Sequence, residues 1–523
     1  MKIYEGAVLT VDKNDSVAKY LVEDGGKIVF VGDTLPDEYK NAQKISLGNG
    51  CLVPAFVDTH QHFASFAVFN SGLNVMNASS NAEILEMSKE YIKKHPDVKT
   101  VIAFGASPYS VSDGVLVSRE QLDSVCPDKP MFVAKYDGHA AIVNTVLLNK
   151  LNDKLKVLRG YHPDTGEMNQ EAFFVVSSYV TNSINIPELV SAMKSAVDYE
   201  AANGVGMIHT VSGIGFPMDM DISLEKWFGR SLENGFQMRV FSQTMNTKLA
   251  IKRGFPRIGG CFACALDGCF GSKDAAMNED YDGAEGNGVL YYTDEKVTAF
   301  MKEANRAGLQ IEVHAIGDRA FDQATRCLKA ALDDYPRKNH RHTIIHDCLP
   351  TKTGVAICKE YNILMAMQTA FIGWKQEPDE YLEELMGKQR ASRLNPMREL
   401  WDEGIFIAAG SDAPCTDPAP LSWIDHAVNN KSCPEQALTV KEALRMCTYN
   451  GCYITFDENE RGSLEKGKIA DMVILSDNIY EIPAEKLPGV KVTKTILGGK
   501  DYKKLSKGFL STVVSGMLGK GKI

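Results

Sequence analysis

Four apolar stretches with the composition of β-strands are each followed, within a few residues, by a side chain that can bind a metal ion. In chain order these stretches and the side chains that follow them are residues 51–57 with His60 and His62, 309–313 with His314, 342–345 with His346, and 405–409 with Asp412. Parallel strands that close into a barrel bring their carboxyl ends to one mouth, where barrel enzymes place their catalytic groups. The pattern therefore predicts an α/β fold, a (β/α)8 barrel of the TIM type, with these side chains at its mouth.

His60 and His62 are the clearest local indication of a metal site. On a strand, residues i and i+2 point to the same side, so both imidazoles project together. Neutral imidazole is a preferred ligand of zinc and other first-row metals. Chance also places two histidines this close in a chain with 11 of them, and any single histidine can be a hydrogen-bonded core residue. The recurrence at four strand ends favours a catalytic metal site with nitrogen and oxygen ligands.

In this order the motifs resemble the amidohydrolase superfamily, and within it the YtcJ-like branch, which includes N-substituted formamide deformylases. The resemblance extends from about Val8 to Lys500. It implies a barrel accompanied by a small β-sandwich, and a hydrolase of C–N bonds, but no particular substrate. The matching segments are 54–62 (Pro-Ala-Phe-Val-Asp-Thr-His-Gln-His), 314–319 (His-Ala-Ile-Gly-Asp-Arg), His346 and 410–414 (Gly-Ser-Asp-Ala-Pro), with support from 137–139 and 267–268.

The distribution of β-like runs and turns predicts a composite small domain around the barrel. Residues 1–50 and 455–523 both alternate short β-like runs with turns, and the resemblance implies that the two ends form one β-sandwich. Residues 51–454 hold the barrel, with a large insertion at about 70–200 between its first two strands. The expected barrel strands are 52–57, 206–209, 237–243, a strand near 261–266, the strands that end at His314 and His346, 362–367 and 405–409.

Two further histidines are candidate catalytic residues. His209 closes the second strand and is expected to face the mouth. His139 belongs to the motif Asp137-Gly-His139 of the insertion, which on its own also fits a turn with a surface histidine. The resemblance implies that this motif folds over the mouth, where His139 contacts the substrate or stabilises an oxyanion.

One position departs from the superfamily pattern. Many members carry on strand four a lysine whose carboxylated side chain bridges two metal ions. Alignment on Asp267 and Gly268 puts that position at Ala263, which then faces the mouth, with Cys264 on the opposite face of the strand. We therefore expect one divalent metal ion per chain, with zinc as the first candidate and iron or manganese as alternatives. The expected ligands are His60, His62, His314 and Asp412, with His346 beside them as a further ligand candidate.

The 12 cysteines are scattered along the chain. Without a secretory signal pattern at the start, this usage favours reduced thiols and a cytoplasmic protein. The only cluster, Cys261, Cys264 and Cys269, matches no zinc or iron–sulfur spacing well. We expect these thiols to pack in the core, and a metal or redox role is the less favoured alternative.

Charge and composition narrow the range of partners. A net charge of −10 without a basic stripe argues against nucleic acid. No apolar run approaches the roughly 18 residues of a membrane span, and the glycine-containing loop 212–216 matches no nucleotide-binding pattern. We expect a small-molecule substrate. The apolar tail after Lys503 is expected to form a helix that docks on the enzyme or on a neighbouring subunit, so a homo-oligomer is possible.

These observations predict a metal-dependent hydrolase that cleaves an amide-like C–N bond of an N-formyl or N-acyl amine. Asp412 is the expected general base for the water. His346, His209 or His139 is expected to polarise the carbonyl group. Two chemical alternatives are a cyclic-amide hydrolase and an amino-heterocycle deaminase. A third is a non-catalytic binding relative that has lost the bridging lysine.

Overall fold

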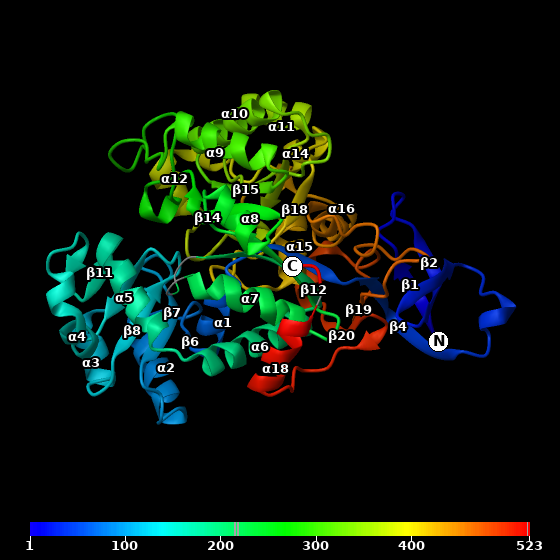
Figure 1. Ribbon diagram of the computed structural model, residues 1–523, viewed down its shortest axis with the longest axis horizontal. Helices are drawn as coiled ribbons and strands as arrows, with labels where there is room; N and C mark the ends of the chain where they lie inside the picture. Colours follow the sequence, from blue (N-terminus) through cyan, green and yellow to red (C-terminus); the bar gives the residue numbers. More distant parts are fainter. Residues whose placement is uncertain (214–215, 217–218, 520) are drawn as a thin grey trace.

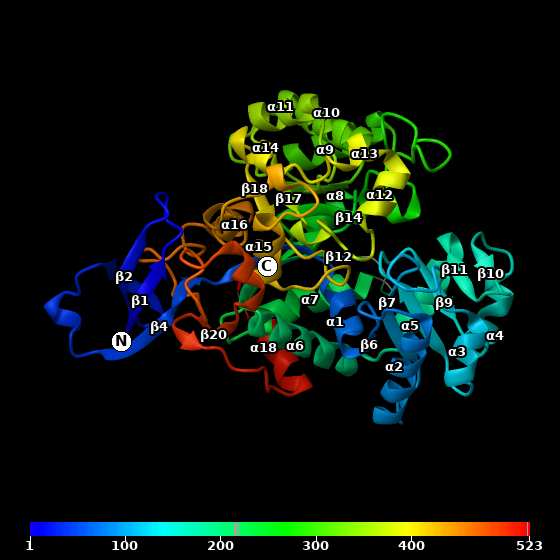
Figure 2. The same cartoon turned by 180° about the vertical axis from the view of Figure 1, so that it is seen from behind.

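The computed structural model describes residues 1–213, 216, 219–519 and 521–523, so the expected loop 212–216 lies partly outside the described residues. A β-sheet from both chain ends, a parallel barrel and an insertion with its own sheet follow one another along the molecule (Figure 1). The end sheet and the insertion lie on opposite sides of the barrel in both views (Figure 2).

Eight parallel strands form the barrel, and a bridge between Gln61 and Ala413 joins the first strand to the segment after the last. The predicted (β/α)8 barrel is therefore confirmed. In the order of their pairing the strands are β5 (Phe56–Gln61), β12 (Val205–Ser212), β13 (Gln237–Ser242), β14 (Arg257–Ala265), β15 (Gln310–Ala315), β16 (Thr343–His346), β17 (Leu364–Met367) and β18 (Ile407–Ala409).

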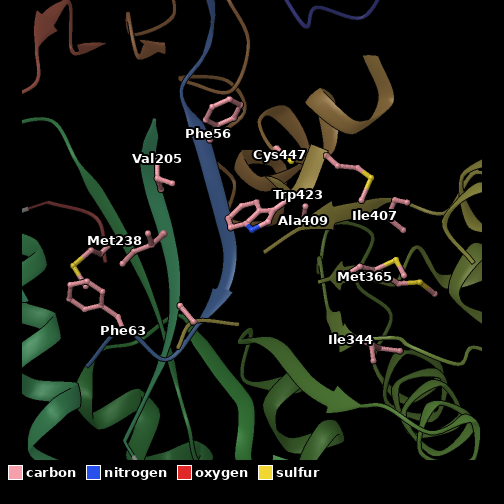
Figure 3. Close-up of a cluster of buried hydrophobic side chains, with 14 of the residues drawn as sticks. Phe56, Phe63, Val205, Met238, Ile344, Met365, Ile407, Ala409, Trp423 and Cys447 are labelled. Atoms are coloured by element: carbon pink, nitrogen blue, oxygen red, sulfur yellow. The ribbon is translucent and has the colours of Figure 1, made fainter. Parts of the chain in front are cut away.

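Amphipathic helices cover the outside of the barrel. In α10 the buried residues Phe321, Ala324 and Leu328 recur at helical spacing, which is the pattern of a helix with one apolar face. Side chains from β5, β12, β17 and β18 meet those of the helices in one core cluster, which includes Trp423 (Figure 3). The helices are α6 (Ile186–Ala202), α7 (Met220–Ser231), α8 (Thr247–Arg253), α9 (Asp294–Arg306), α10 (Asp318–Asp334), α11 (Lys352–Tyr361), α12 (Asp379–Met386), α13 (Lys388–Ala391), α14 (Met397–Asp402), α15 (Pro420–Val428), α16 (Val440–Met446) and α17 (Tyr449–Ile454).

The first barrel strand differs from its prediction. The apolar run expected as one strand over 52–57 is divided between two sheets, since 52–54 belong to β4 (Gln43–Pro54) and the barrel strand begins at Phe56. The N–H of Ala55 donates to Asp471 O on the end-sheet side, and the N–H of Phe56 donates to Gly204 O beside the barrel. An apolar run shows where a buried strand lies but not which sheet it joins.

The two chain ends together form one seven-stranded sheet. Its order is β21-β20-β19-β4-β1-β2-β3, so strands from the start and the end of the chain are neighbours. Tyr4, Leu21 and Met472 are buried together in its core. The other strands are β1 (Lys2–Leu9), β2 (Val17–Asp24), β3 (Lys27–Gly32), β19 (Met472–Leu475), β20 (Val492–Leu497) and β21 (Lys500–Asp501).

The segment between β5 and β12 carries a six-stranded sheet of its own, in the order β10-β11-β9-β8-β7-β6. Separate apolar clusters around Val133 and Phe132, which alternate along β8, give this sheet a core on each face. Its elements are α1 (Phe63–Ser71), β6 (Leu73–Asn74), α2 (Asn81–Lys94), β7 (Val101–Ala106), α3 (Arg119–Val125), β8 (Met131–Lys135), β9 (Ala140–Val143), α4 (Thr145–Leu155), β10 (Tyr161–His162), β11 (Glu167–Asn169) and α5 (Gln170–Asn182).

The tail of the chain forms α18 (Phe509–Leu518), which packs on α7 and α6. Thr512 and Gly516 are buried on the inner side, and a Cβ at Gly516 would lie only 2.3 Å from Trp227 O. The predicted docking of a tail helix on the enzyme is confirmed. Among the described residues, no helix is long and apolar enough to cross a membrane.

A buried ion pair joins the barrel to the segment that returns to the end sheet. Arg239, on β13, donates to both carboxylate oxygens of Asp457 at 2.8 and 2.7 Å, and both side chains are almost fully buried. Arg239 also donates to Lys522 O at 3.2 Å. Two parallel hydrogen bonds of this kind fix the geometry as well as the charge.

Removing Arg239 takes away the hydrogen-bonded counter-charge of the buried Asp457 and leaves it with the more exposed Lys522 Nζ at 3.7 Å. We expect Arg239→Met to lower the free energy of unfolding by about 3–5 kcal/mol, measured by chemical denaturation. The double variant with Asp457→Leu is expected to lose less than the sum of the two single variants. As a control, Arg159→Met breaks the exposed contact with Glu171 and is expected to have little effect. Equal effects at the two sites would contradict the role of the buried pair.

Candidate metal centre

Two groups of potential metal ligands meet at the mouth of the barrel and share His60. In the first, the Nε2 atoms of His60 and His62 lie 3.2 and 3.4 Å from Asp412 Oδ1. In the second, Cys261 Sγ lies 3.1 Å from His60 Nε2 and 3.6 Å from His346 Nε2. The structure thus brings together four of the five predicted ligands and adds a thiol that the sequence analysis assigned to packing.

β5 and the segment after β18 meet along a seam formed by residues 58–62 and 411–413, where the barrel closes. Hydrogen bonds across this seam hold the first group in place. Asp412 N donates to His60 O at 2.8 Å, and His62 N donates to Ala413 O at 2.8 Å. These bonds align the carboxylate of Asp412 beside the two imidazoles. Asp412 has a φ of 55°, in the left-handed region that a non-glycine residue adopts at a cost.

A second buried carboxylate, Asp58, holds the same seam from within. Its oxygens accept hydrogen bonds from Ser411 N (2.9 Å), Ser411 Oγ (2.5 Å) and His60 N (3.3 Å). Burial raises the pKa of Asp58 to about 7, although the hydrogen bonds from Ser411 lower it. Asp58 thus connects the strand that carries His60 to the segment that carries Asp412.

The protonation states of Asp412, His60 and His346 suit metal binding. Burial by itself raises the pKa of Asp412, but the imidazoles of His60 and His62 outweigh burial and hold it well below its usual range. Burial lowers the pKa of His60 and, more strongly, that of His346. The carboxylate of Asp412 is therefore ionised and the imidazoles of His60 and His346 are neutral, which are the forms that bind a metal ion.

A hydrogen bond to Gln368 sets the tautomer of His346. Gln368 Nε2 donates to Ala366 O at 3.3 Å, so the Oε1 atom of Gln368 faces His346 Nδ1 at 2.7 Å. Because Oε1 can only accept, Nδ1 carries the proton and the Nε2 lone pair points to the site. Gln368 plays the supporting part that hydrogen-bond acceptors usually play behind metal-binding histidines.

His314 lies next to His346, but its Nε2 atom contacts Gly268 and Asp267. Its ring centroid is 4.5 Å from that of His346, while its Nε2 lies 3.1 Å from Gly268 O and 3.4 Å from Asp267 Oδ1. Burial lowers the pKa of His314, but the contact with Asp267 outweighs it and the net direction is upward. Nε2 donates to the carbonyl, so only Nδ1, which is buried and without a hydrogen-bond partner among the described residues, is left to bind a metal ion.

His139 approaches the site from the insertion. Its ring lies 6.2 Å from that of Phe262, and the Phe262 ring lies 5.0 Å from that of His62. His139 N donates to Asp137 Oδ1 at 3.1 Å, and Asp137 forms an ion pair with Lys135 at 2.8 Å. The Asp137-Gly-His139 motif therefore reaches the mouth of the barrel, one aromatic ring away from a predicted ligand.

The structure does not bring His209 into either group. Its Nε2 lies 3.1 Å from Thr455 Oγ1, and Thr455 donates to Asp457. Burial, followed by the positive charge of Arg257, lowers the pKa of His209 to about 3. The expectation that His209 closes the second strand is wrong, because β12 continues to Ser212 and leaves His209 inside the strand, where its ring contacts Thr455 of the segment after α17.

The expectation that Ala263 faces the mouth on strand four is wrong, because Cys261 occupies that place. The pairing of β14 with β15 jumps from Gly260–Val313 to Ala265–His314, so residues 261–264 form a bulge. Cys264 lies in the outer core, as expected, and Phe262 is partly exposed. A pair of glycines inside a predicted strand, Gly259 and Gly260, was the available signal, since such glycines often mark a bulge.

The donor set fits a metal ion. Asp412 Oδ1 is buried and makes no hydrogen bond to any described residue, although two ring nitrogens lie within 3.4 Å of it. Ligand atoms on one tetrahedral zinc ion are about 3.4 Å apart for nitrogen and oxygen. A buried anion of this kind needs a cation beside it, and the neutral imidazole of His60 does not supply one.

The sequence matches one protein family and is similar to known proteins over nearly its whole length. The model of the amidohydrolase family matches residues 43–501. The chain is 23% identical to the putative amidohydrolase YtcJ of Bacillus subtilis, over 94% of this chain and 96% of that protein. It is 22% identical to N-substituted formamide deformylase of Arthrobacter pascens, over 95% and 97% of the two chains. The resemblance found in the motifs is therefore confirmed.

A solved structure has the same fold over nearly all of the chain. An uncharacterized metal-dependent hydrolase from Pyrococcus horikoshii superposes with a TM-score of 0.73 at 21% identity, covering 92% of this chain and 99% of that one. At this level of identity the likeness shows a shared fold, and function has to be argued from the site.

The contact between Gln368 and His346 can be tested directly. We expect Gln368→Ala to lower zinc affinity by about 10–100-fold, measured by competition with a chelator, because the Nε2 lone pair of His346 is no longer held toward the site. Gln368→Glu keeps an acceptor and is expected to restore most of the affinity. Gln323→Ala, a buried glutamine of α10 outside the site, is the matched control. Unchanged affinity in Gln368→Ala would refute this positioning of His346.

Proposed function

Because the chain belongs to the amidohydrolase family, we propose that it cleaves the amide-like C–N bond of an N-formyl or N-acyl amine with the help of a bound divalent metal ion. The observation that carries the proposal is the contact of Asp412 with both His60 and His62 at the barrel mouth. The similarity to a formamide deformylase supports this class of bond.

We propose one zinc ion per chain, held by His60, His62 and Asp412 with His346 beside them. Both groups of ligands contain His60 Nε2, and a ring nitrogen has one lone pair and binds one ion. The two groups therefore cannot each hold an ion through His60, which supports a single ion. His314 is the least supported member of the predicted set, because its Nε2 already donates to Gly268 O.

His60, His62 and Asp412 would hold a divalent ion, which would make hydroxide available at neutral pH by lowering the pKa of water to about 7. Asp412 is the general base, since it is ionised, buried and at the centre of the first group. It accepts the proton of the attacking water and passes it to the leaving nitrogen of the substrate.

His139 is the better candidate to stabilise the developing oxyanion. It lies across Phe262 from His62, on a motif that Asp137 and Lys135 hold over the mouth. His346 is less suited to this part, because its proton is on Nδ1 and its Nε2 can only accept. A well-placed donor contributes roughly 3 kcal/mol to such a reaction.

Aromatic rings beside the site favour an apolar group on the substrate. The Phe371 ring stacks against that of His346 at 6.1 Å, and Trp374 stacks on Phe371 at 4.8 Å. Such faces accept flat or apolar groups and offer no partner to a negative charge. We expect apolar N-substituents to be preferred over anionic ones.

A hydrolysis screen of the zinc-loaded protein tests this function. Its arms are N-formyl and N-acyl amines with apolar or charged substituents, cyclic amides and amino-heterocycles. We expect release of a carboxylic acid and an amine from the first arm. Ammonia released from amino-heterocycles alone would contradict the proposed bond and support the deaminase alternative.

The general-base role of Asp412 has its own test. We expect Asp412→Asn to lower kcat by about 10²–10⁴-fold, because the amide cannot take the proton of the water. The protein is expected to remain folded by circular dichroism. Asp417→Asn, at an exposed aspartate of the same loop, is the matched control and is expected to keep its activity. More than about a tenth of the kcat of the natural protein in Asp412→Asn would contradict the assignment.

The ligand role of His60 and His62 predicts a change in metal content. The double variant His60→Ala/His62→Ala is expected to hold less than one metal ion per chain by elemental analysis. It is also expected to lose the stabilisation that added zinc gives the natural protein in a thermal melt, since binding to the native state adds to its stability. The exposed pair His95 and His162, both changed to Ala, provides the control. An unchanged metal content would refute the ligand assignment.

A further inference from the structure

We propose that the Cys261 side chain is a ligand of the metal ion, as a thiolate bound beside His60. This inference rests on the proposed function, because it assumes that the cluster at the barrel mouth holds the ion. It concerns a residue that the sequence alone placed in the packing of strand four.

The distances around Cys261 are those of a shared ion. Its Sγ atom lies 3.1 Å from His60 Nε2 and 3.6 Å from His346 Nε2. Sulfur and nitrogen ligands on one tetrahedral zinc ion are about 3.5 Å apart, since the Zn–S and Zn–N bonds are about 2.3 and 2.0–2.1 Å long. The thiol therefore lies within a few tenths of an ångström of a ligand position.

The backbone of β14 explains why Cys261 points inward. Gly259 and Gly260 have φ angles of 116° and 109°, which only glycine adopts without strain. A Cβ at Gly259 would lie 1.8 Å from Glu312 O, so the strand runs very close to β15 at this point. The bulge that follows brings Cys261 into the barrel, while Cys264 remains in the outer core.

The charge balance of the site also favours a thiolate. When bound to a metal ion, an imidazole is neutral and a carboxylate is an anion, so His60 and His346 add no charge and Asp412 adds one negative charge. A second anion makes the bound dication electrically neutral with its ligands, which lowers the cost of burying it. On binding, the S–H bond of Cys261 breaks, its proton leaves to the solvent and the sulfur lone pair forms the bond to the metal ion.

A sulfur ligand narrows the choice of metal. Thiolates favour zinc and softer ions, whereas manganese and magnesium prefer oxygen ligands. Cys261 therefore supports zinc over manganese at this site. With His60, His62 and Asp412, the thiolate makes four protein ligands, and catalytic zinc accepts a fifth ligand, so the water keeps a place.

X-ray absorption of the zinc-loaded natural protein tests the proposal without any substitution. We expect one sulfur atom at about 2.3 Å from zinc together with nitrogen and oxygen at about 2.0–2.2 Å. A zinc environment of nitrogen and oxygen alone would overturn the proposal. The measurement does not depend on turnover, so its result is separate from that of the substrate screen.

Cobalt substitution identifies which cysteine is involved. We expect the cobalt-loaded protein to show a sulfur-to-cobalt charge-transfer band in the near ultraviolet. Cys261→Ser should lose this band and bind zinc at least about tenfold more weakly, while Cys264→Ser, a buried cysteine of the same bulge, should keep both properties. A band that persists in Cys261→Ser would overturn the assignment.

The two experiments distinguish this proposal from the function on which it rests. Zinc bound through sulfur in a protein that hydrolyses none of the substrates would refute the proposed reaction and support the Cys261 ligand. Hydrolysis of N-formyl amines by a protein whose zinc has only nitrogen and oxygen ligands would refute the Cys261 ligand alone.

Discussion

The closure of the barrel between its first and last strands is the constraint on which the site depends. Asp58 receives hydrogen bonds from Ser411 and from His60 N, and Asp412 N in turn bonds to His60 O. Parallel strands far apart in the chain can share a ligand set only if their register is fixed to a fraction of an ångström. Here a buried carboxylate and two backbone hydrogen bonds set that register. The same contacts that close the barrel therefore fix the geometry of the candidate metal site.

The electrostatics of the mouth follow from burial. Asp412 is ionised while the neighbouring imidazoles are neutral, an arrangement that lacks a positive charge at its centre. A low-dielectric environment makes an uncompensated anion costly and strengthens its attraction to a cation. Burial and the charge of Asp412 raise the pKa of the Cys261 thiol, so under our proposal the thiol loses its proton only when the cation is bound.

Much of the fold could be predicted from the sequence because its signals are local. Strand-like runs ending in His314, His346 and Asp412 predicted strands of a parallel barrel, and the structure has these strands. The division of the first run between two sheets at Ala55 and the bulge after Gly260 were not predicted. Both depend on which distant strand supplies a hydrogen-bond partner, and that choice is made only when the sheets assemble.

The sequence by itself determined the family, the barrel and the kinds of side chain available at its mouth, since these are properties of residue type and spacing. The tertiary structure decided which atoms meet. It turned His209 toward Thr455, engaged His314 Nε2 with Gly268 O and brought Cys261 Sγ next to His60. The orientation of a side chain depends on the partners of its backbone and its ring nitrogens, and those partners come from segments tens to hundreds of residues away.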